Sequence, residues 1–123
     1  MTHANKSILV VDDTRSMRKM VAAVLGSAGY EVAEAGDGVE ALELAQTRRF
    51  DLVVTDHNMP RMDGVTLVRE LRQLPSYDAV ALLVLSTEVD PALKQKGREA
   101  GATGWMVKPF DPQRMLNIVG QFV

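Results

Sequence analysis

ILVVDD, at residues 8–13, is a continuous apolar run that ends in two aspartates. Four apolar residues without a polar interruption are typical of a strand buried on both faces, as in a parallel sheet covered by helices. The stretch LVVTD at residues 52–56 has the same form, an apolar strand followed by a carboxylate. The two stretches predict parallel strands whose acidic residues lie at the carboxyl edge of one sheet.

Strand and helix patterns alternate along the rest of the chain. We expect further strands at 31–35, 79–85 and 104–107. Residues 31–35 contain two glutamates, which suit an edge strand better than a central one. Five strand–helix units with short connections predict an α/β fold with helices on both faces of the sheet. We expect residues 1–123 to form a single domain without an output domain.

The expected helices follow from apolar spacing and from residues that favour helix ends. The first should bury Met17, Met20, Val21, Val24, Leu25 and Ala28 and stop at Gly29. Asp37 can cap the second helix, which runs to about Arg48, and the third covers 65–74. The fourth begins near Pro91, is weakened by Gly97 and ends at Gly101. The fifth starts at Asp111-Pro112 and should bury Met115, Ile118, Val119 and Phe122.

Composition excludes several classes of function. The chain has 123 residues, of which 46% are hydrophobic and 24% charged, as in ordinary globular domains. The net charge of -2 does not favour nucleic acid, and no apolar run approaches a membrane span. The absence of cysteine excludes disulfides and thiolate metal sites. We therefore expect a cytoplasmic protein that binds neither nucleic acid nor membranes. We also expect it to be a monomer.

Polar residues end four of the expected strands. They are Asp12 and Asp13 after the first, Asp56 after the third, Ser86 and Thr87 after the fourth, and Lys108 after the fifth. Carboxylates at close range repel one another unless a cation lies between them, and Mg²⁺ prefers oxygen ligands. Asp56 could then attack phosphorus as a nucleophile, with the metal and Lys108 neutralising charge and Ser86 donating a hydrogen bond.

Each of these residues also has an ordinary structural explanation. Asp12 and Asp13 could cap a helix, Ser86 could stabilise a turn, and Lys108 could be a solvated lysine. His57 could be a metal ligand, but an exposed loop position is the stronger interpretation because carboxylates suit Mg²⁺ better. The arrangement of all the polar residues at four strand ends favours the site over these separate explanations.

The same residues resemble the receiver domains of two-component response regulators, over the whole chain and in the same order. The motifs are VVDD at 10–13, DHNMPRMDG at 56–64, Ser86, and KPF at 108–110. With Ser16-Met17-Arg18 after the acidic pair, the chain is most similar to the stand-alone, CheY-like chemotaxis regulators. This resemblance implies a flavodoxin-like (βα)5 fold with strand order 2-1-3-4-5, with which the edge character of 31–35 agrees.

The resemblance also implies roles for the site residues. Asp56 would be the phosphoacceptor, and Mg²⁺ would bind Asp13, Asp56 and the backbone carbonyl of Asn58, with Asp12 acting through water. Ser86 and Lys108 would contact the phosphoryl group, and the Lys108-Pro109 bond would be cis. Ser86 and Trp105 would form the switch, although the family usually has Tyr or Phe where Trp105 stands.

The implied function is a signalling switch that catalyses only its own phosphorylation and dephosphorylation. The donor would be a histidine kinase of the CheA type or a small phosphodonor. The surface of helix four, strand five and helix five would bind a partner such as the flagellar motor switch protein. Lys94 replaces an apolar residue on that surface and weakens the motor assignment. The alternative is a phosphorelay intermediate that passes the phosphoryl group to a histidine phosphotransfer protein.

Two other classes fit the sequence less well. A phosphohydrolase that works through an aspartyl phosphate needs an acid two residues after the nucleophile, and Asn58 occupies that position. A flavin-binding module of similar architecture needs a phosphate-binding loop rich in Ser, Thr or Gly after the first strand. Asp12 and Asp13 at that point would repel a phosphate.

Overall fold

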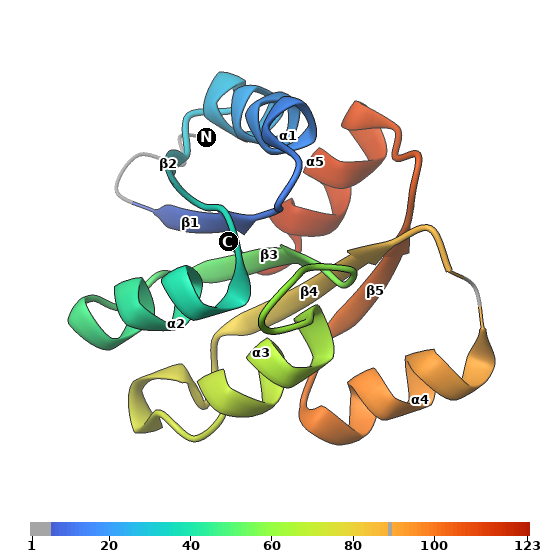
Figure 1. The fold of residues 1–123 in the computed structure, drawn as a ribbon. Coiled ribbons are helices and arrows are strands. Elements are labelled where there is room, and N and C mark those ends of the chain that lie inside the picture. The colour runs from blue at the N-terminus through green and yellow to red at the C-terminus, as the bar shows by residue number, and fades with distance from the viewer. Residues whose placement is uncertain (1–5, 89) are drawn as a thin grey trace.

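A five-stranded parallel sheet forms the centre of the computed structural model (Figure 1). The structure describes residues 6–88 and 90–123. The strands are β1 (Ser7–Val11), β2 (Glu31–Ala35), β3 (Leu52–Asp56), β4 (Ala81–Ser86) and β5 (Gly104–Val107). Their order is β2-β1-β3-β4-β5, and every neighbouring pair is parallel. This topology confirms the predicted flavodoxin-like, doubly wound α/β fold.

Helices cover both faces of this sheet. They are α1 (Arg15–Ser27), α2 (Gly38–Thr47), α3 (Gly64–Leu71), α4 (Pro91–Ala100) and α5 (Pro112–Gly120), with a short 3₁₀ turn η1 (Pro75–Tyr77). Figure 1 shows α1 and α5 on one face and α2, α3 and α4 on the other. Within residues 6–88 and 90–123, none of the helices has the length and apolar character needed to cross a bilayer.

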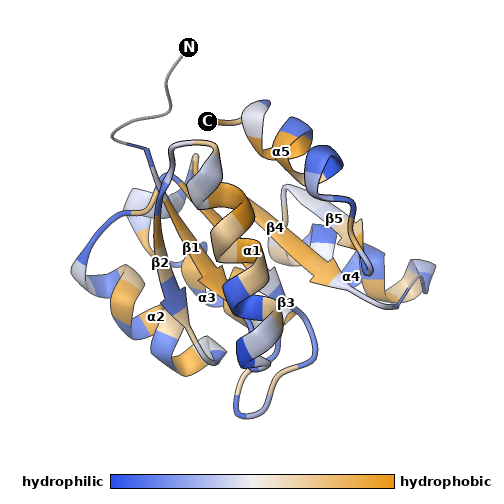
Figure 2. Ribbon diagram, turned by 90° about the horizontal axis from the view of Figure 1, so that it is seen from above, coloured by the Kyte–Doolittle hydropathy of each residue, from blue (hydrophilic) through white to orange (hydrophobic). Residues whose placement is uncertain are grey.

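Two layers of buried side chains hold the helices on the sheet. Strand side chains alternate between the faces, so neighbouring residues such as Leu82 and Leu83 belong to different layers. The central strands are apolar along their length, whereas β2 carries polar residues, as Figure 2 shows by colour. Glu31 is exposed and Glu34 is partly buried, as expected for the edge strand that β2 proves to be.

Aspartates begin most of the helices. Asp37 accepts a hydrogen bond from the Glu40 N–H at 2.8 Å, and Asp111 accepts one from the Arg114 N–H at 3.2 Å. The cap at Asp37 and the start of the fifth helix at Asp111-Pro112 were predicted, and Gly101, with φ of 112°, ends α4 as expected. Asp12 and Asp13 do not cap α1. The N-cap of that helix is Thr14, which makes no side-chain capping bond.

The segment between α3 and β4 differs from the expectation. The third helix ends at Leu71 instead of residue 74, and the fourth strand covers Ala81–Ser86 instead of 79–85. The 3₁₀ turn occupies the space between them and buries Tyr77 completely. The Tyr77 hydroxyl donates to the Arg48 carbonyl at 2.8 Å and accepts from the Phe50 N–H at 3.0 Å. Contacts with residues distant in the sequence therefore shape this segment.

Two apolar residues that were expected in the core lie on the surface. Met20 is 51% exposed and Phe122 is 45% exposed, so both predictions were wrong. In α1 the residues packed deepest against the sheet are Val21 and Leu25. Helical spacing places a residue near the apolar face, but the neighbouring elements decide where that face ends.

Candidate functional site

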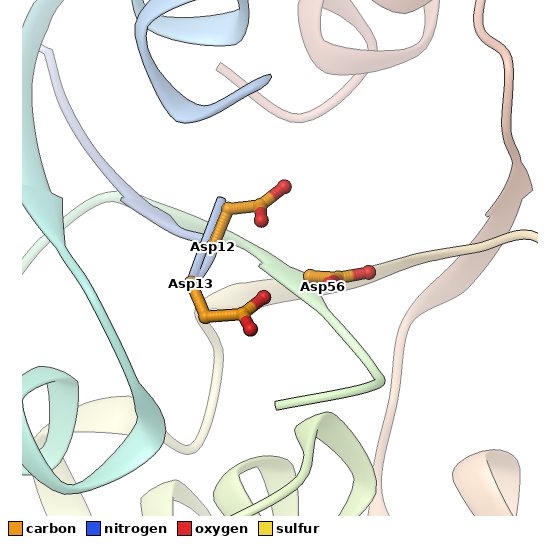
Figure 3. Close-up of side chains that lie close together, drawn as sticks. All are labelled: Asp12, Asp13 and Asp56. Atoms are coloured by element: carbon orange, nitrogen blue, oxygen red, sulfur yellow. The ribbon is translucent and has the colours of Figure 1, made fainter. Parts of the chain in front are cut away.

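Three carboxylates meet at the carboxyl ends of β1 and β3. Asp12 and Asp13 follow β1, and Asp56 is the last residue of β3. One oxygen of each lies within 4.8 Å of an oxygen of the others. Asp12 and Asp56 are buried and Asp13 is exposed, and Figure 3 shows the three groups directed toward the same space. The parallel sheet explains this meeting, because neighbouring strands end at one edge.

Lys108 brings a positive charge to the carboxylates from the other side. It follows β5, and its Nζ lies 2.9 Å from Asp56 Oδ1 and 3.5 Å from Asp12 Oδ2. The Lys108 side chain is only 13% exposed. Its backbone N–H donates to the Ser86 carbonyl at 2.8 Å, which continues the pairing of β5 with β4. The Lys108-Pro109 bond is cis, as expected.

The charges at this site are unbalanced. Burial raises the pKa of the Asp56 carboxyl, the contact with Lys108 opposes the rise, and the charge of Asp12 adds to it. Burial alone would lower the pKa of Lys108, but Asp56 and Asp12 outweigh that effect and raise it. One ammonium group thus faces a larger number of carboxylates. A divalent cation with a preference for oxygen, such as Mg²⁺, fits this set of donors.

Ser86 and Asn58 come from the two segments next to Asp56, the end of β4 and the loop after β3. Ser86 is the last residue of β4 and is completely buried. Its Oγ accepts a hydrogen bond from the Glu88 N–H at 3.0 Å. Asn58 lies in the loop after β3 and is exposed, as is Thr87 after β4. The structure therefore gathers Asp12, Asp13, Asp56, Ser86 and Lys108 at one edge of the sheet, with Asn58 in the adjoining loop.

His57 is buried, which corrects the expectation of an exposed loop residue. Its Nδ1 accepts a hydrogen bond from the Val65 N–H at 3.4 Å, at the start of α3. Its ring centroid lies 6.0 Å from that of Trp105, with the planes tilted by 45°. The cluster of possible metal ligands among the described residues does not include it. His57 thus packs beneath the site instead of facing the carboxylates.

Trp105 lies between the sheet and α4. A Cβ atom on Gly97 of α4 would come within 2.8 Å of the indole ring, so the helix approaches the ring as closely as only glycine allows. The indole Nε1 is buried and has no hydrogen-bond partner among the residues that the structure describes. A buried N–H without a partner costs free energy, so this packing of Trp105 is not fully satisfied.

Two supports of the site could not be foreseen from the pattern of apolar residues. Arg61, in the loop after β3, binds Asp37 through Nη2 at 2.6 Å and Nε at 3.1 Å. This ties the loop to the start of α2, and Arg61 adopts a φ of 68°. Gly64 lets α3 begin against the site, because a Cβ there would lie 2.5 Å from the Asp56 carbonyl oxygen. Both Arg61 and Gly64 lie in the motif at 56–64, but nothing in the sequence indicated that Arg61 would bind Asp37.

Comparison with known proteins agrees with this geometry. The family model described as the response regulator receiver domain matches residues 8–120. The transcriptional regulatory protein PhoP for alkaline phosphatase synthesis, from Bacillus subtilis, is 39% identical over 90% of this chain and 45% of its own length. Response regulator MprA from a Mycobacterium species is 41% identical over 89% of this chain and 46% of its own. The chain thus spans less than half the length of these curated relatives.

Solved structures give matches that extend over whole chains. Chemotaxis protein CheY4 of Vibrio cholerae is 45% identical, with a TM-score of 0.93 over 98% of this chain and 100% of that one. The receiver domain of sensor histidine kinase PA1611 of Pseudomonas aeruginosa is 27% identical, with a TM-score of 0.89 over 97% and 98% of the two chains. That structure has a magnesium ion coordinated in its active-site cleft.

Proposed function

The chain belongs to the response regulator receiver domain family, and on this premise we propose that Asp56 is its phosphoacceptor. The observation that carries the proposal is the ion pair between Asp56 and Lys108 at 2.9 Å inside the carboxylate cluster. The protein would act as one receiver unit in the cytoplasm, taking its phosphoryl group from the phosphohistidine of a histidine kinase. It would catalyse only its own phosphorylation and dephosphorylation.

The proposed reaction is a displacement at phosphorus. A carboxylate oxygen of Asp56 forms the new O–P bond while the N–P bond of the phosphohistidine breaks and the imidazole leaves. The Lys108 ammonium, already at hydrogen-bonding distance from Asp56 Oδ1, would neutralise charge on the phosphoryl oxygens. Ser86 would turn its hydroxyl from the Glu88 N–H toward a phosphoryl oxygen.

Asp13, Asp56 and the backbone carbonyl of Asn58 would hold Mg²⁺, with Asp12 acting through water. The contacts of Asp12 support this division, since its Oδ1 accepts from the Thr14 N–H at 2.9 Å and its Oδ2 lies near Lys108. Asp13 is exposed and open to a ligand. When bound, the ion would neutralise the carboxylates and the charge on the transferring phosphoryl group.

The output surface would be formed by α4, β5 and α5. A groove of ≈ 470 Å³ lies there, lined among others by Lys94, Trp105, Lys108 and Arg114. Because Lys108 lines the groove and also touches Asp56, a change at the acceptor has a short path to this surface. Ser86 and Trp105 would carry the switch, with the indole ring changing its packing when Ser86 moves toward the phosphoryl group.

Chemotaxis is the proposed setting, because the match to CheY4 covers both chains almost completely. The kinase would be of the CheA type, and the flagellar motor switch protein the partner. One observation favours the alternative of a phosphorelay intermediate: Lys94 is exposed and lines the output groove, where the motor-binding regulators carry an apolar residue. Capture of the motor switch protein by the beryllofluoride-activated chain would support chemotaxis, and reversible phosphotransfer to a histidine phosphotransfer protein would support the relay.

Phosphorylation itself is tested with acetyl phosphate and Mg²⁺. Intact-mass spectrometry of the wild-type protein should show one added phosphoryl group, and peptide mapping should place it on Asp56. The variant Asp56→Asn should stay unmodified, because an amide is a much weaker nucleophile than a carboxylate. Equal modification of wild type and Asp56→Asn would sink the assignment.

A further inference from the structure

The Asp12 carbonyl lies one residue beyond the paired part of β1. The last pairs of that strand join Val11 to Ala35 on one side and to Thr55 on the other. The Asp12 N–H still donates to the Ala35 carbonyl at 3.1 Å, but its own carbonyl has left the sheet. A backbone carbonyl in this semi-buried position needs a donor.

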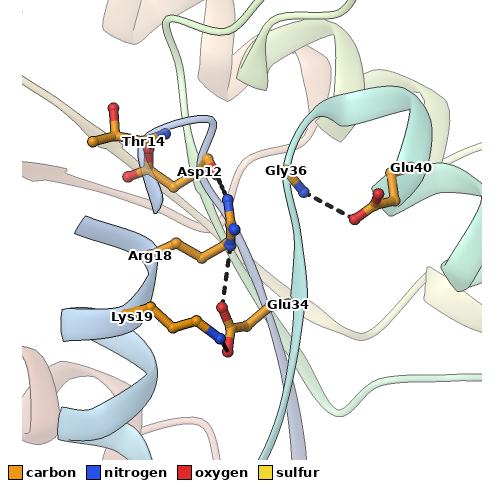
Figure 4. Close-up of polar contacts among 7 residues, drawn as sticks. All are labelled: Asp12, Thr14, Arg18, Lys19, Glu34, Gly36 and Glu40. Carbon is orange, nitrogen blue, oxygen red and sulfur yellow. Dashed lines mark hydrogen bonds and ion pairs between the residues drawn. The ribbon is translucent and has the colours of Figure 1, made fainter. Parts of the chain in front are cut away.

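Arg18 of α1 supplies that donor. Its Nη1 binds the Asp12 carbonyl oxygen at 2.7 Å, and its Nε binds Glu34 of β2 at 3.1 Å (Figure 4). The Arg18 side chain is 17% exposed, so the contact is protected from water. The flat guanidinium group can serve a carbonyl and a carboxylate at the same time because its donors point in fixed directions.

Glu34 holds the guanidinium in place from the far side. It also binds Lys19 Nζ at 3.1 Å, and two cations therefore share this carboxylate. With these contacts, each polar group of Asp12 has a partner. The N–H pairs with Ala35, the carbonyl with Arg18, Oδ1 with the Thr14 N–H, and Oδ2 with Lys108. Asp12 is thus fixed by its own turn and by three other segments of the chain, namely β2, α1 and the end of β5.

We propose that Arg18 is a positioning residue for the Mg²⁺ site, acting through the backbone of the Asp12-Asp13 turn. This inference rests on the proposed function, since it assigns Mg²⁺ to that turn. By holding the Asp12 carbonyl, Arg18 sets the direction in which the chain leaves β1 and so the place of the exposed Asp13 carboxylate. Glu34 is the support that keeps Arg18 in the orientation needed for this contact.

A positioning role and a purely electrostatic role of Arg18 predict opposite changes in Mg²⁺ affinity when Arg18 is replaced. Removing a positive charge near a cation site should tighten Mg²⁺ binding if only the charge mattered. Removing the hydrogen bond should weaken binding, because ligands that lose their outer support typically lose about tenfold or more in metal affinity. The sign of the change therefore separates the two effects.

Lys19 provides a matched control. It stands next to Arg18, carries the same charge and binds the same Glu34, but it is 55% exposed and does not touch the acidic turn. Arg18→Met and Lys19→Met thus remove the same charge, and only the first removes the bond to the Asp12 carbonyl.

The experiment measures Mg²⁺ dissociation constants by titration calorimetry at fixed ionic strength. We expect Arg18→Met to weaken binding about tenfold, Lys19→Met to change it by less than about twofold, and Arg18→Lys to lie between wild type and Arg18→Met. Circular dichroism and unfolding midpoints in EDTA show whether each variant is folded. If Arg18→Met does not fold, Arg18→Lys decides, and unchanged affinity in it would overturn the proposal.

The outcomes also separate this inference from the proposed function. If the wild-type protein binds no Mg²⁺ and Asp56 takes up no phosphoryl group, the proposed function is wrong, and this inference is wrong with it. If the wild-type protein binds Mg²⁺ and Arg18→Met binds it as tightly or more tightly, only the positioning role is overturned.

Discussion

At the residue scale, Asp12 and Asp13 are chemically identical neighbours with different surroundings. Asp12 is 2% exposed, and both of its carboxylate oxygens lie near donors of the protein. Asp13 is exposed. Because both of its oxygens already lie near donors, Asp12 has less capacity left for direct coordination of a cation than the exposed Asp13 has. The local contacts therefore hold the Asp12 carboxylate in place and leave the Asp13 carboxylate accessible to a ligand.

We predict that Asp13→Asn weakens Mg²⁺ binding more than Asp12→Asn does. Asp13 would be a direct ligand, so its loss should cost well over tenfold, whereas a carboxylate acting through water should cost about tenfold. Titration calorimetry of both variants against wild type gives the comparison. Equal losses, or a larger loss for Asp12→Asn, would contradict the proposed ligand roles.

At the element scale, α4 is less flawed than its sequence suggests. Gly97 lowers the intrinsic helix propensity by about 1 kcal/mol relative to alanine. In the structure Gly97 is buried and faces the Trp105 ring at a distance that excludes a Cβ. The glycine therefore allows the helix to lie close to β5. Gly97 thus lowers the helix propensity of α4 but allows the helix to pack against Trp105.

We predict that Gly97→Ala destabilises the protein by about 1–3 kcal/mol, because overpacking outweighs the gain in helix propensity. Trp105 emission should change, since the new methyl group displaces the indole ring. Urea unfolding monitored by circular dichroism, together with fluorescence, measures both effects.

Gly26→Ala is the matched control for this substitution. Gly26 lies in α1, and a Cβ there would meet no atom within 4 Å. This variant should be as stable as wild type or more stable, by up to about 1 kcal/mol, with unchanged emission. A similar gain in stability for Gly97→Ala would contradict the prediction, because it would show that the Trp105 ring can move away from the new methyl group at no cost in free energy.

The N-cap of α2 makes stability depend on pH. The Glu40 N–H and the Arg61 guanidinium bind the Asp37 carboxylate and hold its pKa below the ordinary value. A lowered carboxyl pKa stabilises the fold above the unfolded-state value of about 3.9, and this contribution is lost as the pH falls through the lower, folded-state value. We predict that Asp37→Ala costs about 1 kcal/mol at pH 7 and less in strong acid.

Asp37→Asn separates the cap from the charge. The amide oxygen can still accept from the Glu40 N–H, but it forms no ion pair with Arg61. At pH 7, Asp37→Asn should therefore lower the free energy of unfolding by less than Asp37→Ala does. Urea unfolding of wild type and both variants at about pH 7 and about pH 3 gives the change in the free energy of unfolding for each variant at each pH. A cost of Asp37→Ala that grows as the pH falls would contradict the assigned direction of the pKa shift.

At the scale of the whole molecule, Arg72 joins four segments on the face of α2, α3 and α4. From the end of α3, its guanidinium donates to the carbonyls of Tyr77, Val80 and Gly101. These acceptors belong to η1, the approach to β4, and the end of α4. Burial lowers the pKa of Arg72, yet the group stays charged far above neutral pH. One side chain thus binds backbone carbonyls of several segments at once.

We predict that Arg72→Met destabilises the protein by about 2 kcal/mol or more, because several partly buried carbonyls lose a hydrogen bond from a charged donor. Arg69→Met is the control, since Arg69 is exposed on the same helix, and it should stay within about 0.5 kcal/mol of wild type. Urea denaturation of both variants measures the difference. Equal stabilities would mean that water replaces the Arg72 contacts at no cost.

The proposed switch also spans the whole molecule. The buried Nε1 of Trp105 has no hydrogen-bond partner among the described residues, so a second packing that satisfies this group could lie close in free energy. We predict that beryllofluoride with Mg²⁺ changes Trp105 emission, and that Ser86→Ala abolishes the change. Mg²⁺ alone serves as the baseline. If the wild-type emission does not respond, Trp105 is a fixed packing residue.

Short-range patterns determined much of this protein. The apolar strands, the cap at Asp37, the helix start at Asp111, the stop at Gly101 and the edge character of β2 all depend on residues within a few positions of one another. The meeting of Asp12, Asp56 and Lys108 follows from parallel strands ending at one edge. Such features are predictable because backbone geometry repeats with a fixed period along each element.

Away from the strand ends, the tertiary structure alone decided which side chains from distant segments meet. It buried His57 beneath the site, exposed Met20 and Phe122, and placed Arg18 on the Asp12 carbonyl and Arg61 on Asp37. None of these contacts joins residues of one strand or one helix. They depend on the side-chain volumes and donors of several elements at once. A long arginine can reach many acceptors, and only the packed fold decides which of them it binds.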